Sequence, residues 1–488
     1  MTFEIVFVLL SLLGMVAALV ADKMRPGMIL FSVVVLFLCA GILTPKEMLE
    51  GFSNKGMITV ALLFLVSEGI RQSGTLGQVI KKLLPQGKTS VFKAQLRILP
   101  SVAFISAFLN NTPVVVIFAP IIKHWAKSVN LPATKFLIPL SYVTILGGIC
   151  TLIGTSTNLV VHGMILEAGF EGFSMFELGK VGIFIAIAGI IYLFIFSKRL
   201  LPDARPDTAV PDEEVEEGEK LHRVEAVLGA RFPGINKKLK DFNFQRHYGA
   251  EVKEIKTRNG QRFVSNLEEV VLHEGDTLVV MADDTFIPTW GESSVFVLLT
   301  NGNEPDTTGK KKRWFALLLL VLMIVGATVG ELPITKEMFP DIKLDMFFFV
   351  SITTIVMAWT NLFPARKYTK YISWDILITI ACAFAISKAM VNSGVADSVA
   401  KFIIGLSDDY GPHVLLAMLF IITNLFTELI TNNAAAALAF PLALSIAAQL
   451  GVSPTPFFVV ICMAASASFS TPIGYQTNLI VQGIGNYK

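Results

Sequence analysis

Charged residues are scarce in this chain of 488 residues. Asp, Glu, Lys and Arg make up 16% of it and hydrophobic residues 53%, whereas soluble proteins average about 25% charged and about 45–50% apolar residues. This balance excludes a soluble fold for most of the chain. Several runs of about 18 residues carry few or no charges and are therefore long enough to cross a bilayer. They cover residues 5–21, 27–43, 179–196, 314–329 and 344–359.

Paired cysteines and catalytic motifs are also missing, and we do not expect a cleavable leader. The four cysteines stand singly in apolar runs, without the spacing of a disulfide framework or a metal site. The N-terminus has no basic start and no small-residue cleavage site, so we interpret the first apolar run as a spanning helix. No nucleophile–base pair and no cluster of metal ligands occurs at the polar breaks of the apolar runs. We therefore do not expect an enzyme.

What the sequence does contain is a polar interruption that occurs twice. Residues 110–112 read Asn-Asn-Thr and residues 431–433 read Thr-Asn-Asn, each inside apolar sequence. Each central asparagine has a hydroxyl residue five positions before it and a proline nine positions after it. These residues are Ser106, Asn111 and Pro120 in the first copy, and Thr427, Asn432 and Pro441 in the second.

A second pair of interruptions follows downstream of the first. Residues 150–158 and 470–478 each contain a glycine, Gly154 or Gly474, followed four positions later by an asparagine. The two tips are 321 positions apart and the two downstream asparagines 320 positions apart. This near-constant offset indicates that the same pair of polar motifs occurs twice in the chain. We interpret these motifs as a binding site in the middle of a membrane.

The predicted fold class is an all-α polytopic membrane protein built as an inverted repeat, with a small inserted soluble α+β domain. Segments 91–127 and 412–449 each consist of two apolar arms joined at a polar tip. An arm of about 15 residues reaches only about 20 Å, against a hydrocarbon core of about 30 Å. We therefore predict two re-entrant hairpins. Segments 134–163 and 454–478 are predicted to be discontinuous helices.

Five parts follow from the changes in composition. Strand-like runs at 223–228, 251–257 and 277–281, separated by turn signals, predict the inserted domain. The predicted parts are a first transmembrane repeat at 1–200, an acidic linker at 201–218, the soluble domain at 219–292, a basic linker at 293–313 and a second transmembrane repeat at 314–488.

Orientation follows from the distribution of Lys and Arg. They cluster in segments such as 71–98 and 123–135, whereas the loop at 163–178 has none. Together with an odd number of crossings in each half, this places the N-terminus outside and the inserted domain in the cytoplasm, in a cell membrane of the bacterial inner-membrane type. The first half continues for about 40 residues after Asn158, but only ten follow Asn478. We therefore expect that the sequence is truncated and lacks a final helix.

The chemistry of the interruptions favours an anion beside a small cation. Half-helix N-termini direct free N–H groups and the positive end of the helix dipole at the centre, which suits an anion. Carbonyl, amide and hydroxyl oxygens at broken helices suit Na⁺. Broken helices that meet at the midplane of a repeated fold are typical of secondary transporters.

These motifs resemble those of the divalent anion:sodium symporter family, the sodium-coupled dicarboxylate, citrate and sulfate transporters. The family's paired Ser-Asn-Thr motifs at two hairpin tips match residues 110–112 and 431–433, and the resemblance covers both membrane halves. The insert resembles a TrkA-C domain. The matching segments are Phe232-Pro-Gly, Leu239, Tyr248-Gly, Arg258-Asn-Gly and Glu274-Gly-Asp.

The resemblance implies two sodium sites and a shared substrate site. One sodium site would use Ser106, Asn110, Asn111 and the backbone at Gly154; the other would use Thr427, the carbonyl of Ile430, Asn432 and the backbone at Gly474. The substrate would contact Asn111, Thr112, Asn432, Asn433, Thr155, Ser156, Tyr475 and Gln476. The family's usual Thr-Pro-Pro-Asn is replaced here by Thr155-Ser-Thr-Asn and Tyr475-Gln-Thr-Asn. The added hydrogen-bonding groups favour tetrahedral sulfate over a dicarboxylate such as succinate or citrate.

The sequence thus predicts a sodium-coupled symporter of a small divalent anion, dimeric, with Na⁺ as the coupling ion. We expect the lipid bilayer, the anion and a second copy as partners, and no nucleic acid. Glu428, close to Asn432, is expected to accept hydrogen bonds or balance charge rather than to bind an ion directly. A regulatory ligand on the inserted domain stays open beside a dimerisation role. The alternatives are an ion channel gated by that domain and an arsenite-type oxyanion extruder.

Overall fold

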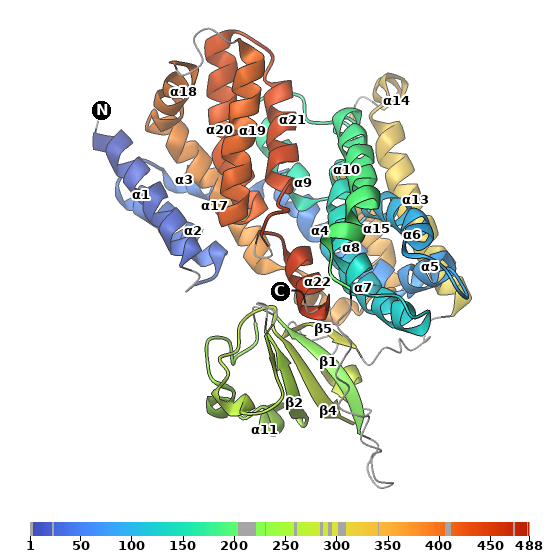
Figure 1. The fold of residues 1–488 in the computed structure, drawn as a ribbon. Coiled ribbons are helices and arrows are strands. Elements are labelled where there is room, and N and C mark those ends of the chain that lie inside the picture. Colours follow the sequence, from blue (N-terminus) through green and yellow to red (C-terminus); the bar gives the residue numbers. More distant parts are fainter. Residues whose placement is uncertain are drawn as a thin grey trace.

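The computed structural model is a helical body with a small sheet against one end (Figure 1). It describes residues 3–21, 24–203, 221–229, 231–257, 261–283, 286–290, 295–300, 309–339, 341–405, 411–471, 474–485 and 487. Most of the predicted acidic linker and part of the predicted basic linker lie outside these residues, as do the Arg258-Asn-Gly segment and the first two residues of the first predicted repeat.

Helices of the first half follow the predicted order. They are α1 (Phe3–Val20), α2 (Pro26–Cys39), α3 (Pro45–Glu50), α4 (Lys55–Gln72), α5 (Thr75–Leu83), α6 (Val91–Ser106), α7 (Asn111–Ser128), α8 (Thr134–Gly148), α9 (Ser156–Glu167) and α10 (Gly179–Leu200). The break in the first hairpin separates α6 from α7, and the break in the discontinuous helix separates α8 from α9. Helix α2 ends four residues before its predicted end at 43, because Gly41 takes a left-handed conformation with φ of +73°.

The second half of the membrane part is also helical. Its helices are α13 (Lys310–Gly330), α14 (Pro333–Met338), α15 (Met346–Trp359), α16 (Tyr368–Tyr371), α17 (Trp374–Asn392), α18 (Val395–Gly405), α19 (Pro412–Leu429), α20 (Asn432–Leu450), α21 (Thr455–Ser466) and α22 (Gln476–Gly485). Helix α18 was not predicted. It follows Gly394 (φ +74°), just as α5 follows Gly74 (φ +68°).

Seven helical segments among the described residues are long and apolar enough to cross a membrane. Several of them present large apolar side chains to the outside, including Phe184 and Ile195 on α10 and Trp314 on α13. A continuous apolar exterior of this kind is stable against lipid and unstable against water. The chain is therefore an integral membrane protein.

The strands form a five-stranded antiparallel sheet in the order β3-β2-β4-β1-β5. Its strands are β1 (His222–Leu228), β2 (Glu251–Lys256), β3 (Arg262–Phe263), β4 (Thr277–Ala282) and β5 (Phe296–Thr300), with the short helices α11 (Phe244–Tyr248) and α12 (Phe286–Trp290). An aromatic cluster of Phe232, Phe242, Phe244, Tyr248 and Phe296 fills its core.

The three predicted strands agree with β1, β2 and β4, whereas β3 and β5 were not predicted. Strand β5 pairs with β1 through Leu299 opposite Ala226, so the sheet extends past the predicted domain end at 292. The sequence of Phe296–Thr300 does not alternate between apolar and polar residues, and Phe296 is buried in the aromatic core. It therefore lacks the usual sequence signal of a half-exposed strand.

The sheet lies beside α7 and α22, as Figure 1 shows. These are the helices that begin at residue 111 and residue 476. The sheet therefore contacts two helices whose first residues belong to the predicted site.

Candidate functional site

Both hairpin tips place an asparagine at the first turn of a helix. Helix α7 begins at Asn111 and α20 begins at Asn432, and the residues before them, Asn110 and Thr431, are extended (ψ 141° and 147°). Neither of these preceding side chains caps its helix. The first N–H groups of both helices are therefore left for another partner, which is the arrangement that favours a bound anion.

A hydroxyl group makes the same two hydrogen-bonding contacts at each tip. Ser106 Oγ lies 2.9 Å from the side-chain oxygen of Asn111 and 2.8 Å from the carbonyl oxygen of Thr144. Thr427 Oγ1 lies 2.8 Å from the side-chain oxygen of Asn432 and 2.6 Å from the carbonyl oxygen of Ala465. Each hydroxyl shares its one hydrogen between a tip asparagine and a helix that ends nearby.

The discontinuous helices also match each other. Asn158 Nδ2 donates to the carbonyl oxygens of Thr151 (2.8 Å) and Gly148 (3.4 Å). Asn478 Nδ2 donates to those of Ser468 (2.8 Å) and Thr471 (3.4 Å). These amides satisfy carbonyls that the helix breaks release, and so each asparagine stabilises the break that precedes it.

Each tip meets the break of the other half. Asn111 Nδ2 donates to the hydroxyl of Tyr475, which also lies 3.2 Å from Thr155 Oγ1. The Tyr475 hydroxyl therefore joins the first tip to both breaks.

The flanking residues of the tips make the corresponding contacts. Thr112 Oγ1 donates to Gln476 Oε1 at 3.4 Å. On the other side, Ser156 and Thr157 both donate to Asn433 Oδ1 at 3.3 Å. The structure thus brings the predicted substrate-binding residues together in one polar cluster, although Gln476 is exposed and its contact is long.

Two glycines make room for the first tip. A Cβ atom on Gly148 would lie 2.5 Å from Asn111 Oδ1, and one on Gly154 would lie 2.4 Å from the carbonyl oxygen of Gly148. The backbone of the first break therefore approaches Asn111 more closely than any residue with a side chain would allow. Asn110 does not join this contact and instead lines a small cavity with Ser156 and Phe108.

The second break is held by a carboxylate. Glu428 accepts hydrogen bonds from the backbone N–H groups of Ser470 and Thr471 (3.0 Å each) and from Thr471 Oγ1 (2.8 Å). The expected hydrogen-bonding role of Glu428 is confirmed. A Cβ atom on Gly474 would lie 3.2 Å from the same carboxylate and 2.0 Å from Ser468 Oγ.

Replacing Glu428 by alanine is expected to lower the free energy of unfolding by about 1–3 kcal/mol, because three donors lose their acceptor. Thermal unfolding of the purified protein in detergent measures this. Glu337→Ala, at an exposed position of α14, is the matched control and should leave the melting temperature unchanged. Equal melting temperatures for both variants would contradict the role of Glu428.

Several residues of the site were not predicted. Thr157 and Ser468 lie within it, and Ser141 Oγ donates to Thr477 Oγ1 (2.8 Å) and Asn478 Oδ1 (2.7 Å). The position of Ser468 corresponds to Gly148 in the other half, at the 320-residue offset, so the repeat gave no signal for a hydroxyl there. Ser141 lies in an apolar run without a polar neighbour in the sequence that would mark it.

Some oxygen atoms in the site have no protein partner. Within the described residues, the buried Asn158 Oδ1, Thr431 Oγ1 and Ser468 Oγ accept or donate no hydrogen bond. The predicted contributor Ile430 ends α19 with an extended backbone (φ −131°, ψ 179°) and is buried. No group of three or more His, Cys, Asp or Glu side chains suited to a metal occurs among the residues that the structure describes. The oxygens without a partner named above are amide and hydroxyl oxygens.

The known proteins that this chain is similar to are transporters. The family described as citrate transporter (CitMHS) matches residues 16–448, with a second match at 342–487. An uncharacterised transporter of Synechocystis is 29% identical over 93% of this chain and 88% of its own length. The transporter YfbS of Escherichia coli is 25% identical over 100% of this chain and 95% of its own length. Sodium/sulfate cotransporter 1 of Chlamydomonas reinhardtii is 33% identical over 58% of this chain and 32% of its own length.

Proposed function

We propose, for a chain that belongs to the citrate transporter family, that it is a secondary active transporter coupling the inward movement of Na⁺ to that of a small divalent anion. The observation that carries this proposal is the exchange of contacts between the two halves, in which Asn111 donates to the Tyr475 hydroxyl while Ser156 and Thr157 donate to Asn433. Two helix N-termini and a set of neutral hydroxyl and amide groups then face one centre. Such a centre suits a doubly charged anion that brings its own cations.

The proposed architecture is an inverted repeat. In its support, a hydroxyl bonds to the tip asparagine five residues later and to a carbonyl 38 residues later in both halves. The break asparagines bond to carbonyls seven and ten residues earlier in both halves. With five crossings per copy, the second copy would be upside down, the N-terminus would face outwards and the sheet domain would lie in the cytoplasm.

Sodium would bind beside each tip. The first site would use Ser106, Asn110 and Asn111 with the backbone at Gly154. The second would use Thr427, the Ile430 carbonyl and Asn432 with the backbone at Gly474. Buried oxygens without a partner, such as Thr431 Oγ1 and Ser468 Oγ, support a cation near the second tip, because an unpaired buried oxygen is costly unless a donor or cation reaches it.

Sulfate is the anion that we favour. The hydroxyls of Thr112, Thr155, Ser156 and Tyr475, with the amides of Asn111, Asn432, Asn433 and Gln476, would supply donors around a compact tetrahedral anion. A relative of this chain is a sodium/sulfate cotransporter by name, whereas the family name refers to citrate. A dicarboxylate therefore remains the second candidate for the same site.

Transport would proceed as the hairpins move against the remaining helices, which would form a dimeric scaffold. The sheet domain would be a TrkA-C-like module, able to hold a regulatory ligand. Neither a gated channel nor an oxyanion extruder is favoured by the relatives, which carry the names of transporters and cotransporters.

Uptake into proteoliposomes tests the proposal. An inward Na⁺ gradient should drive accumulation of labelled sulfate, and replacing Na⁺ by K⁺ should reduce the initial rate by at least about tenfold if both cation sites must fill. Unlabelled succinate and citrate distinguish the anions through competition. Uptake that does not depend on Na⁺, or that no divalent anion inhibits, would overturn the proposal.

A further inference from the structure

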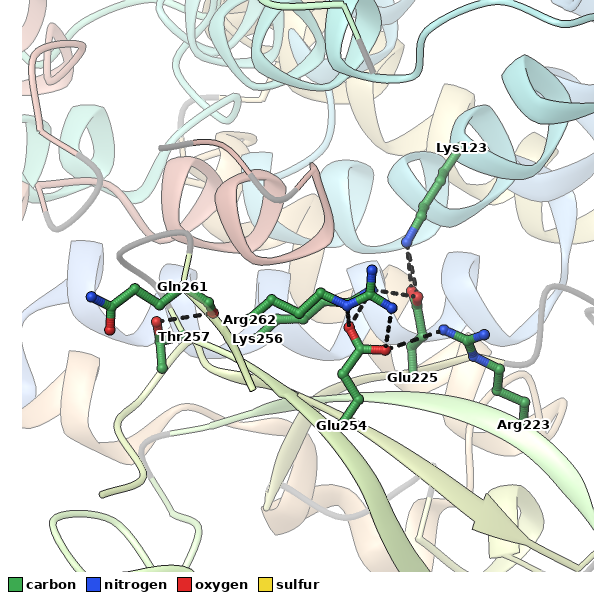
Figure 2. Close-up of polar contacts among 8 residues, drawn as sticks. All are labelled: Lys123, Arg223, Glu225, Glu254, Lys256, Thr257, Gln261 and Arg262. Carbon is green, nitrogen blue, oxygen red and sulfur yellow. Dashed lines mark hydrogen bonds and ion pairs between the residues drawn. The ribbon is translucent and has the colours of Figure 1, made fainter. Parts of the chain in front are cut away.

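The sheet domain is joined to the first hairpin by a partly buried ion pair. Lys123 Nζ, on α7, lies 2.8 and 2.9 Å from the two carboxylate oxygens of Glu225 on β1 (Figure 2). Lys123 follows Asn111 by twelve residues of α7, about 18 Å along the helix, with Pro120 between them. A displacement of the sheet at Glu225 therefore acts on the same helix that carries Asn111.

The carboxylate of this pair is held from the other side as well. Lys256 Nζ on β2 lies 3.4 Å from Glu225, and the Lys256 and Glu225 side chains are only 9% and 18% exposed. Burial raises the pKa of the Glu225 carboxyl, but Lys123 and Lys256 outweigh it and lower that pKa to about 2. Glu225 is thus ionised throughout the physiological pH range and always available to Lys123.

A charged network extends from this pair across the sheet. Arg262 on β3 contacts Glu254 on β2 at 2.5 and 3.1 Å, and Arg223 on β1 reaches the same carboxylate at 3.6 Å. Lys256 is 3.8 Å from Glu254 and so links it to Glu225. The network in Figure 2 spans three strands, and α7 is therefore anchored to the sheet as a whole and not to a single loop.

A second contact joins the sheet domain to α22. Gly275, with φ of +85°, is so close to α22 that a Cβ atom there would lie 2.5 Å from Leu479 Cγ. A Cβ atom on Gly483 would lie 2.8 Å from the Gly275 carbonyl oxygen and 3.0 Å from Thr277 Oγ1. Leu479 lies about one helical turn after Gln476, the residue that accepts a hydrogen bond from Thr112.

The two contacts converge on one pair of helices. Helices α7 and α22 carry Asn111 and Thr112, and Gln476, at their first turns, and Tyr475 directly precedes α22. Both helices pack against each other and against the sheet domain. Their relative position fixes the Asn111–Tyr475 and Thr112–Gln476 contacts.

We propose that the sheet domain acts as a clamp on the anion site, and that Lys123 and Glu225 are positioning residues that hold the Asn111 tip in register with α22. This inference rests on the proposed function, since the clamp sets the affinity of the same site for its anion. Breaking the ion pair lets α7 shift along α22, separates the tip from Tyr475 and Gln476, and weakens anion binding without removing any group that touches the anion.

The test is a double-mutant cycle with Lys123→Met and Glu225→Gln. Each single variant should raise the KM for sulfate uptake roughly tenfold, in line with coupling inside buried charge networks, and should change the maximal rate far less. The double variant should be no worse than either single one. Lys123→Arg should retain the wild-type KM. Lys127→Met, at an exposed lysine one turn further along α7, is the control and should have no effect.

Hydrogen–deuterium exchange of the purified full chain separates the clamp from the transport proposal. Backbone exchange at residues 111–116 should rise in Lys123→Met and Glu225→Gln, but not in Lys127→Met. If wild-type protein takes up no divalent anion, the proposed function fails while the exchange data still test the clamp. Unchanged exchange and unchanged KM in both single variants would overturn the clamp, and so would additive effects in the double variant.

Discussion

Asn111→Asp is expected to reduce the initial rate of sulfate uptake by at least about 100-fold, because a buried carboxylate near the anion costs several kcal/mol. Asn111 is 1% exposed. Its side-chain oxygen accepts from Ser106 and its nitrogen donates to Tyr475. Aspartate keeps the size and the acceptor but replaces the donor by a charge of the same sign as the substrate. Proteoliposome uptake under a fixed Na⁺ gradient measures the loss.

Asn130→Asp provides the matched control. Asn130 lies just beyond the other end of α7, is exposed and has φ of 60°, a conformation that aspartate also adopts. This variant should transport at the wild-type rate. Wild-type uptake by Asn111→Asp would show that the first tip does not face the anion, and the proposed site would then be wrong.

Gly148→Ala is the second change with a large expected effect. The new Cβ atom would lie 2.5 Å from Oδ1 and 3.0 Å from Nδ2 of Asn111, so the asparagine must rotate and lose its bonds to Ser106 and Tyr475. We expect uptake to fall by about 10- to 100-fold and the free energy of unfolding to fall by about 1–3 kcal/mol, as in other overpacked interiors. Uptake and thermal unfolding of the same preparation measure both effects.

Gly14→Ala is its control. A Cβ atom on Gly14, in the middle of α1, would meet no atom within 4 Å. Alanine should be neutral or slightly stabilising there, because it favours a helix more than glycine does. If Gly148→Ala behaved like Gly14→Ala, the close approach of α8 to the tip would not matter for transport.

The sequence was sufficient to predict the parts of the site that are local in the chain. Polar residues within apolar runs predicted where α6 ends and α7 begins at the first tip, and where α19 ends and α20 begins at the second. The same signal predicted the breaks in the discontinuous helices. A helix in an apolar environment ends where polar residues or glycines provide partners for, or expose, its terminal N–H and C=O groups. These features therefore depend only on the nearby sequence.

The contacts across the site depend on packing and could not be derived in this way. Nothing in the sequence around Asn433 indicates that Ser156 and Thr157 will donate to it. Ser468 was missed because its counterpart at the same offset is Gly148, so the two copies differ where the repeat was the only guide. The two-residue strand β3 and the mostly apolar strand β5 were not predicted, because neither shows alternation over enough residues.

The exchange of contacts between the two halves has a consequence for leakage. In the proposed transport cycle, moving a tip away from the opposite break removes its bonds there, that of Asn111 to Tyr475 for the first tip and that of Asn433 to Ser156 for the second. Bound solute and ions would replace these lost partners. We therefore expect partly loaded protein to face a higher barrier than the fully loaded form, which would keep slippage of the ion gradient low.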